Sequence, residues 1–228
     1  MANMQVPVIT IDGPSGSGKG TISRLLANEL GWHFLDSGAL YRLVALAARR
    51  HAIPFDDEGG LQTLAAHLDV QFVSDAAGLE TRILLEGEEV TNGVRSEECG
   101  NDASKVAVIQ SVRDALLARQ RAFCQLPGLV ADGRDMGTVI FPNAKLKVFL
   151  DASLEERASR RYKQLREKGI DASIDGLFDE LAERDRRDRS RAVSPLKPAA
   201  DAVTIDSSTL GIQEVLSQVL ALWQKIEK

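Results

Sequence analysis

A glycine-rich segment, GPSGSGKGT at residues 13–21, constrains the fold of this chain more than any other feature. It stands between an apolar, β-branched run, VPVITIDG, and a helical sequence, TISRLLANEL. Gly13, Gly18 and Lys19 satisfy the spacing G-x-x-x-x-G-K. A buried strand that passes through such a loop directly into a helix is typical of a parallel sheet with right-handed crossovers, so the segment predicts an α/β fold.

The same segment predicts a phosphate-binding loop, or P-loop. Glycines let the backbone curl so that its N–H groups point at phosphate oxygens, and the following helix N-terminus adds partial positive charge. Lys19 supplies a mobile cation, and Gly20 stands where the strict pattern has Ser or Thr, which places the hydroxyl on Thr21 instead. We expect ATP to bind the whole loop, namely Gly13, Pro14, Ser15, Gly16, Ser17, Gly18, Lys19, Gly20 and Thr21.

The remaining sequence alternates between short apolar runs and helical stretches. Further strands are predicted around residues 32–36, 128–133, 146–152 and 202–208, which together with the first strand indicate about five strands in a parallel sheet flanked by helices. Residues 69–95 instead alternate apolar and polar positions, with turn sequences at 75–78 and 86–89. This alternation predicts a small inserted antiparallel β subdomain, followed by helix over 96–125.

Composition excludes several classes of protein. The net charge of -5 argues against a binder of nucleic acid polymers, and no apolar run approaches the roughly 18 residues that span a bilayer. The start of the chain lacks the basic and apolar regions of a signal peptide. Two cysteines form neither a disulfide framework nor a metal site. We therefore expect a cytoplasmic protein, and the absence of an exposed heptad pattern weakly favours a monomer.

Polar residues follow two of the predicted strands. DSGALYR places Ser37 where it can cap the next helix, with Tyr41 and Arg42 on its first turns. ADGRDMG places Asp132 at a strand end, where a carboxylate can join the shell of a magnesium ion, and Arg134 follows it. Ligands of parallel sheets bind beyond the carboxyl ends of the strands, so both segments are expected near a bound nucleotide.

Taken together, five segments resemble the bacterial cytidylate kinases along nearly the whole chain: GPSGSGKGT, LDSGALYR, DGRDMGTVIFP, FLDAS and ERDRRDRSR. Adenylate kinases share the P-loop, but would show D-G-[FY]-P-R where this chain has DGRDMG. The resemblance implies a nucleoside-monophosphate-kinase-like fold that uses ATP and Mg²⁺ to phosphorylate CMP and dCMP. It also implies a monophosphate-binding insert over about residues 63–98 and a short helical lid over about 153–169.

The resemblance further implies roles for individual residues. Cytosine presents an amino donor at N4 beside two acceptors, and Asp135 would accept from N4 while Ser104 and Arg113 donate. Helix spacing alone would leave Arg113 facing solvent. The acceptor phosphate and sugar would be held by Ser37, Arg42, Arg134 and Arg191, and Asp188 would accept from a ribose hydroxyl. Tyr41 is also expected to bind the substrate, and the catalytic group would be Lys19, Arg134, Asp188 and Arg191.

Two further arginine groups leave alternatives open. Arg184, Asp188 and Arg191 recur at helical spacing and share one face, although a salt-bridged surface helix would show the same pattern. In the lid segment, Arg157, Arg160 and Arg161 are candidates to reach ATP, and Arg160 is our choice. Histidines and tryptophans show no catalytic spacing, and Trp32 and Trp223 are predicted to serve packing.

Other functions fit the sequence less well. A small-metabolite kinase, acting for example on shikimate, would share the P-loop, but this alternative does not account for the large insert or for the DGRDMG segment. A regulatory GTPase would need an N-K-x-D sequence, which is absent. A nonenzymatic nucleotide-binding module would not need so many arginines on the acceptor side.

Overall fold

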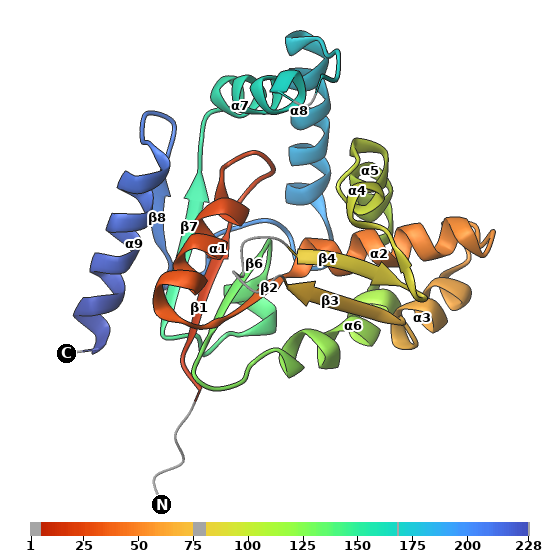
Figure 1. Cartoon of the computed structure of the whole chain (residues 1–228), viewed down its shortest axis with the longest axis horizontal. Coiled ribbons are helices and arrows are strands. Elements are labelled where there is room, and N and C mark those ends of the chain that lie inside the picture. Colours follow the sequence, from red (N-terminus) through yellow and green to blue (C-terminus); the bar gives the residue numbers. More distant parts are fainter. Residues whose placement is uncertain (1–5, 75–80, 168, 228) are drawn as a thin grey trace, which may run out of the picture. The chain divides into compact units, whose positions relative to one another are not determined.

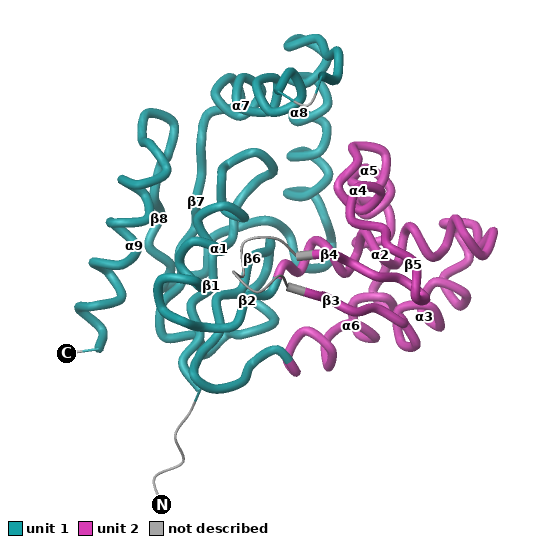
Figure 2. The backbone as a smooth tube through the Cα atoms, viewed as in Figure 1, with its two compact units in different colours: residues 1–35, 123–228 teal, residues 36–122 magenta. Residues whose placement is uncertain are grey.

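The computed structural model describes residues 6–74, 81–167 and 169–227, and divides into two compact units. Unit 1 combines residues 1–35 with residues 123–228, and unit 2 consists of residues 36–122 (Figure 2). The P-loop therefore lies in unit 1. None of the helices in the described ranges has both the length and the apolar character needed to cross a membrane.

A five-stranded sheet organises unit 1, in the order β2-β6-β1-β7-β8 (Figure 1). Its strands are β1 (Val8–Asp12), β2 (His33–Asp36), β6 (Leu129–Gly133), β7 (Leu146–Asp151) and β8 (Val203–Asp206). The central strand β1 pairs in parallel with both β6 and β7, and β7 pairs in parallel with β8. All residues of β1 and β6 are buried, as an apolar strand covered on both faces requires. The predicted α/β fold is confirmed.

In the described part of unit 1 the helices are α1 (Lys19–Leu30), α7 (Leu154–Glu167), α8 (Ile174–Ser190) and α9 (Ile212–Glu227), together with the short π-helix η1 (Met136–Ile140). Buried side chains of α1 and α9 join those of the strands in one apolar core, which includes Ile9, Leu26 and Val148. Trp223 lies in this core, and Trp32 packs edge-on against it with ring centroids 5.0 Å apart. The tryptophans thus serve packing, as predicted.

Unit 2 contains a small antiparallel sheet of β3 (Val70–Ser74), β4 (Thr81–Leu85) and β5 (Glu88–Glu89). Its helices are α2 (Ser37–Arg50), α3 (Glu58–Ala66), α4 (Thr91–Val94), α5 (Glu97–Val106) and α6 (Gln110–Ala122). Glu86 and Gly87 have positive φ and turn β4 into β5, so the predicted antiparallel meander is confirmed there. The other predicted turn, at 75–78, lies outside the described residues. Unit 2 includes the predicted 63–98 insert, whose role in binding a monophosphate stays a prediction.

The start of α2 differs from the prediction. Asp36, not Ser37, is the N-cap, because its backbone is extended and its side chain accepts a hydrogen bond from the Ala39 amide at 3.0 Å. Ser37 is the first residue of the helix and is buried. The strand β2 therefore ends on the residue that caps the next helix, and the Ser37 hydroxyl is not needed for capping.

Candidate active site

The loop between β1 and α1 has the backbone that a phosphate-binding site requires. Gly18 has a φ of 89°, in the left-handed region that favours glycine, and directly precedes α1. A side chain at Gly13 would place its Cβ 2.1 Å from the Leu150 carbonyl oxygen, so only glycine fits there. The Lys19 ammonium donates to the Pro14 carbonyl at 3.2 Å and so folds back over the loop.

Asp132 lies beside this loop because β6 pairs with β1 in parallel, with Asp132 level with Ile11. One carboxylate oxygen is 4.0 Å from the Lys19 ammonium, and Asp132 is buried. The other oxygen would be 3.1 Å from a Cβ at position 20. A side chain at position 20 would therefore lie against Asp132, and the carboxylate would have to shift slightly to admit it.

The donor atoms here suit a magnesium ion. Mg²⁺ prefers oxygen ligands and is commonly bound by one or two carboxylates together with phosphate oxygens of the substrate. Asp132 offers a carboxylate against Gly20, and the next residue, Thr21, carries an exposed hydroxyl. Within the described part of the chain, no three or more His, Cys, Asp or Glu side chains gather as an all-protein metal site. The residues fit an ion that arrives with its nucleotide.

Asp12 is a site residue that the sequence analysis did not single out. Its buried carboxylate accepts hydrogen bonds from the backbone amides of Met136 at 2.9 Å and Gly137 at 2.8 Å. Burial, only partly offset by these amides, raises the pKa of Asp12 to about 6. Asp12 therefore joins the end of β1 to the first turn of η1, directly after Asp135. The only signal in the sequence was an acidic residue ending a buried apolar strand.

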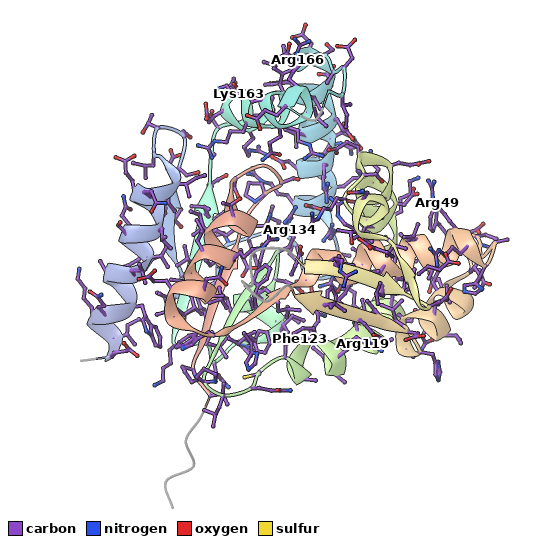
Figure 3. All side chains as sticks on the ribbon, viewed as in Figure 1. Arg49, Arg119, Phe123, Arg134, Lys163 and Arg166 are labelled. Atoms are coloured by element: carbon purple, nitrogen blue, oxygen red, sulfur yellow. The ribbon has the colours of Figure 1, made fainter. Side chains whose placement is uncertain are left out.

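Asp188 on α8 holds two arginines side by side. Arg134 donates from Nε to one carboxylate oxygen at 2.9 Å, and Arg191 donates to the other oxygen (Arg134 is labelled in Figure 3). Burial would raise the pKa of Asp188, but the charges of Arg134 and Arg191 outweigh it and hold that pKa below its usual range. Arg191 lies just beyond the end of α8, so the predicted helix face shared by Arg184, Asp188 and Arg191 does not extend to Arg191. The catalytic role of Arg134, Asp188 and Arg191 stays a prediction.

The electrostatics of Arg134 complement those of Asp188. Burial would lower the pKa of the guanidinium, but Asp188 and, more weakly, Asp132 outweigh it and raise that pKa further. Arg134 therefore stays charged at any physiological pH. Asp135, the next residue, is 3% exposed and precedes η1. Its predicted contact with cytosine stays a prediction.

The lid arginines differ in their contacts. Arg160 on α7 donates to the carbonyls of Ser17 and Ser207 and to the hydroxyl of Ser207, and it pairs with Glu156. Its guanidinium thus lies against the P-loop backbone, and its predicted contact with ATP stays a prediction. Arg161 donates to Gln164 on the same helix. The predicted lid over 153–169 includes α7, while residue 168 lies outside the described residues.

Arg42 in unit 2 lies against α5. Its Nη1 donates to the carbonyls of Val94 and Ser96, both at 2.9 Å. A Cβ at Gly100 would be 2.8 Å from Nη2, so the guanidinium occupies the space that a side chain on this turn of α5 would fill. Gly100 is therefore a residue that shapes the Arg42 site, and its isolated position within a helical sequence was the available signal.

Arg113 is buried, although helix spacing alone predicted a solvent-facing side chain. It is 6% exposed, donates from Nη1 to the Ala107 carbonyl at 3.0 Å, and lies over the Tyr41 ring with its Cζ 5.6 Å from the centroid. Ser37 and Ser104 of the same unit are buried as well. The expectation drawn from periodicity is therefore wrong for Arg113, and its predicted contact with cytosine stays a prediction.

The predicted site residues divide between the two units. Unit 1 contains the P-loop, Asp132, Arg134, Asp135, Arg160, Asp188 and Arg191, and unit 2 contains Ser37, Tyr41, Arg42, Ser104 and Arg113. A strand–loop–helix phosphate site at the carboxyl edge of a five-stranded parallel sheet defines the class of P-loop nucleotide-binding proteins.

Comparison with known proteins identifies the family within this class. The family model described as "Cytidylate kinase" matches residues 9–225. A cytidylate kinase from Shewanella denitrificans is 61% identical over 95% of both chains, and one from Pseudomonas savastanoi pv. phaseolicola is 62% identical over 96% of this chain and 95% of its own. The chain belongs to the cytidylate kinase family, as the sequence resemblance indicated.

Among solved structures, a gluconokinase from Sinorhizobium meliloti 1021 aligns with 97% of this chain and 94% of its own, at 17% identity and a TM-score of 0.48.

Proposed function

We propose that this protein transfers the γ-phosphoryl group of ATP to CMP, and yields CDP and ADP. The observation that carries the proposal is the pairing of Arg134 and Arg191 on the buried Asp188 carboxylate, in a member of the cytidylate kinase family whose P-loop lies in the same unit. Paired guanidinium groups match phosphate oxygens well, and are the chemistry that an acceptor phosphate needs.

The donor nucleotide binds the P-loop in this proposal. Backbone amides of residues 13–21 surround its phosphates, and Lys19 and Arg160 add positive charge. Mg²⁺ would be held by Asp132 and Thr21, directly or through water, and it neutralises charge on the phosphates when bound. The Pro14 carbonyl that now accepts from Lys19 is exchanged for phosphate oxygens, which bind an ammonium group more strongly than a neutral acceptor does.

The acceptor nucleotide is bound chiefly by arginines. Arg42, Arg134 and Arg191 bind the phosphate of CMP, supported by the Ser37 hydroxyl. Asp188 keeps Arg134 and Arg191 together and accepts from a ribose hydroxyl once CMP draws the guanidinium groups toward its phosphate.

The base of CMP is bound by a second set of residues. Asp135 accepts from the amino group of cytosine, and Ser104 and Arg113 donate to its acceptor edge. The ring of Tyr41 supports Arg113 from below. Because the base is recognised through an amino donor next to two acceptors, UMP is a poor substrate. We propose dCMP as a second acceptor.

The transfer needs no general base. The second pKa of a phosphomonoester is near 6, so the CMP phosphate is already mostly dianionic at neutral pH. What the protein must supply is alignment of the attacking oxygen with the γ-phosphorus and charge neutralisation as the bond forms. Lys19, Arg134 and Arg191 supply these cations. Closure of the 153–169 lid excludes water, because a water molecule in the acceptor position would hydrolyse ATP.

The last part of the proposal concerns the compartment, the oligomeric state and the class of ligand. We propose a cytoplasmic monomer that uses small nucleotides and not nucleic acid polymers. The acidic net charge of -5 supports the second point, because proteins that bind nucleic acid polymers usually have a basic balance of charge. Both cysteines are free thiols in the structure, Cys99 buried and Cys124 partly exposed, which suits a reducing compartment.

A substrate panel tests the proposal. ADP release from Mg-ATP is measured with CMP, dCMP, UMP, AMP, GMP and shikimate as acceptors, each at concentrations that span its KM. The proposal expects rapid turnover with CMP and dCMP, and weak turnover with UMP. Turnover with AMP or shikimate but not with CMP would disprove the cytosine and phosphate assignments, while leaving the P-loop intact.

A further inference from the structure

One arginine of the predicted lid has its side chain buried in unit 1. Arg157, on the first turn of α7, is 3% exposed. Its Nε donates to the Ala152 carbonyl and its Nη1 to the Ser15 carbonyl, both at 3.0 Å. Nη1 and Nη2 also donate to the two carboxylate oxygens of Asp185, at 3.1 and 2.6 Å. At least four of the five N–H donors of this guanidinium are therefore engaged.

These contacts join three segments that are distant in sequence. Ser15 belongs to the P-loop, Ala152 to the connection after β7, and Asp185 to α8. The loop also packs closely on this arginine, because a Cβ at Gly16 would lie 3.1 Å from the Arg157 Cβ. A planar guanidinium that pairs through two bonds with a carboxylate fixes orientation as well as distance.

Helix α8 connects the Arg157–Asp185 pair to the residues proposed to bind the acceptor phosphate. Asp185 precedes Asp188 by three residues on α8, so both lie on the same side of the helix. At Asp185 the helix is bound through Arg157 to the P-loop, and at Asp188 it is bound to Arg134 and Arg191. Figure 1 shows α7 and α8 together at one end of unit 1, and the two helices are in contact.

We infer that Arg157 and Asp185 form a positioning pair that sets the P-loop and the Asp188–Arg134–Arg191 group at the separation which phosphoryl transfer requires. This inference rests on the proposed function, and it gives Arg157 a role other than contact with ATP. A pair of this kind acts on the alignment of the two phosphates. It therefore affects the rate of transfer more than the binding of ATP, since misplacement by about 1 Å can cost about a hundredfold in rate.

A double-mutant cycle tests the inference with R157K, D185N and the double variant R157K/D185N. The matched controls are R186K and E183Q, because Arg186 and Glu183 form a similar two-bonded pair on the solvent side of the same helix. Steady-state kcat and the KM values for ATP and CMP are measured at a temperature at which thermal unfolding shows every variant folded. D185N keeps the shape of the side chain and serves as the mild variant if R157K does not fold.

The inference predicts that each single variant lowers kcat about tenfold, with KM for ATP changed by less than about twofold. The double variant should be no slower than the slower single variant, because the second substitution removes a partner that is already lost. Both control variants should match the wild type.

Three results would contradict the inference. In the first, R157K raises KM for ATP while D185N behaves as wild type, which would make Arg157 an ATP ligand. In the second, the losses of kcat in the two single variants multiply in the double variant, and in the third, all variants keep the wild-type kcat. A wild-type protein that makes no CDP would instead contradict the proposed function itself, before any variant is compared.

Discussion

Gly100→Ala should weaken CMP binding without weakening the fold. A Cβ at this position would lie 2.8 Å from Nη2 of Arg42 and 3.1 Å from its Cζ and Nη1, whereas ordinary contacts begin near 3.4 Å. The guanidinium must therefore move by about 0.6 Å (3.4 minus 2.8), which can lengthen its hydrogen bonds to the Val94 and Ser96 carbonyls. The atoms that must move are the far end of a flexible side chain, so the backbone of α5 is unaffected.

The expected change in KM for CMP depends on the proposed role of Arg42. If its guanidinium binds the CMP phosphate, the displacement weakens a charge-assisted hydrogen bond worth about 1.5 kcal/mol or more, so KM for CMP should rise about tenfold. KM for ATP should stay within about twofold of the wild type. Alanine is favoured over glycine inside a helix by up to about 1 kcal/mol, so the free energy of unfolding should be unchanged or slightly higher.

The assay is ADP release at saturating Mg-ATP with CMP varied, together with urea unfolding of each variant. Gly93→Ala is the matched control, because a Cβ there would meet only the Leu46 Cδ2 at 3.9 Å, an ordinary contact. Arg42→Ala gives the upper limit of the effect. The reasoning is refuted if Gly100→Ala keeps the wild-type KM for CMP while Arg42→Ala raises it, or if Gly93→Ala produces the same loss.

Three further predictions concern charged side chains of unit 1. Asp188→Asn leaves Arg134 and Arg191 without their carboxylate and should cost about 3 kcal/mol of stability, or roughly 10 °C in Tm, which calorimetry measures; an unchanged Tm contradicts the role of this group. Asp12 has a folded-state pKa of about 6, above the usual 3.8, so the folded protein binds more protons than the unfolded chain between these values. Relative to Asp12→Asn, the wild type should therefore lose on the order of 2 kcal/mol of unfolding free energy as pH rises from about 4 to 7, and parallel pH profiles of the two would contradict this. Lys19→Ala should lower kcat by about a hundredfold or more in the ADP-release assay, and a loss under threefold would remove Lys19 from the catalytic group.

The parts of the fold that depend on local sequence were predictable. The P-loop and its flanking strand and helix are contiguous in the chain, and each strand of the large sheet is a short apolar run between polar breaks. The cap of α2 was predicted one residue too late, at Ser37. The reason is that an aspartate at the end of a strand and a serine after it are both good caps, and only the backbone conformation distinguishes them.

The burial of individual arginines was not predictable from periodicity. Arg113 and Arg157 both lie in helices rich in charged residues, where a solvated side chain is the ordinary expectation. Each is buried because its partners come from other segments: the Ala107 carbonyl and the Tyr41 ring for Arg113, and Asp185 and the Ser15 carbonyl for Arg157. The family resemblance implied a contact with cytosine for Arg113, which is a different statement from its burial. Only the structure identifies the partners of the two arginines.

Direct transfer between two nucleotides is the central claim, and one measurement tests it. The protein is incubated with Mg²⁺ and ATP that carries a radioactive γ-phosphate, with and without CMP, and the nucleotides are separated by chromatography. The account predicts that the label appears in CDP in amounts equal to the ADP formed, with little free phosphate and little ADP when CMP is omitted. Label released as free phosphate at the same rate with or without CMP would contradict it, because the protein would then be an ATPase and not a CMP kinase.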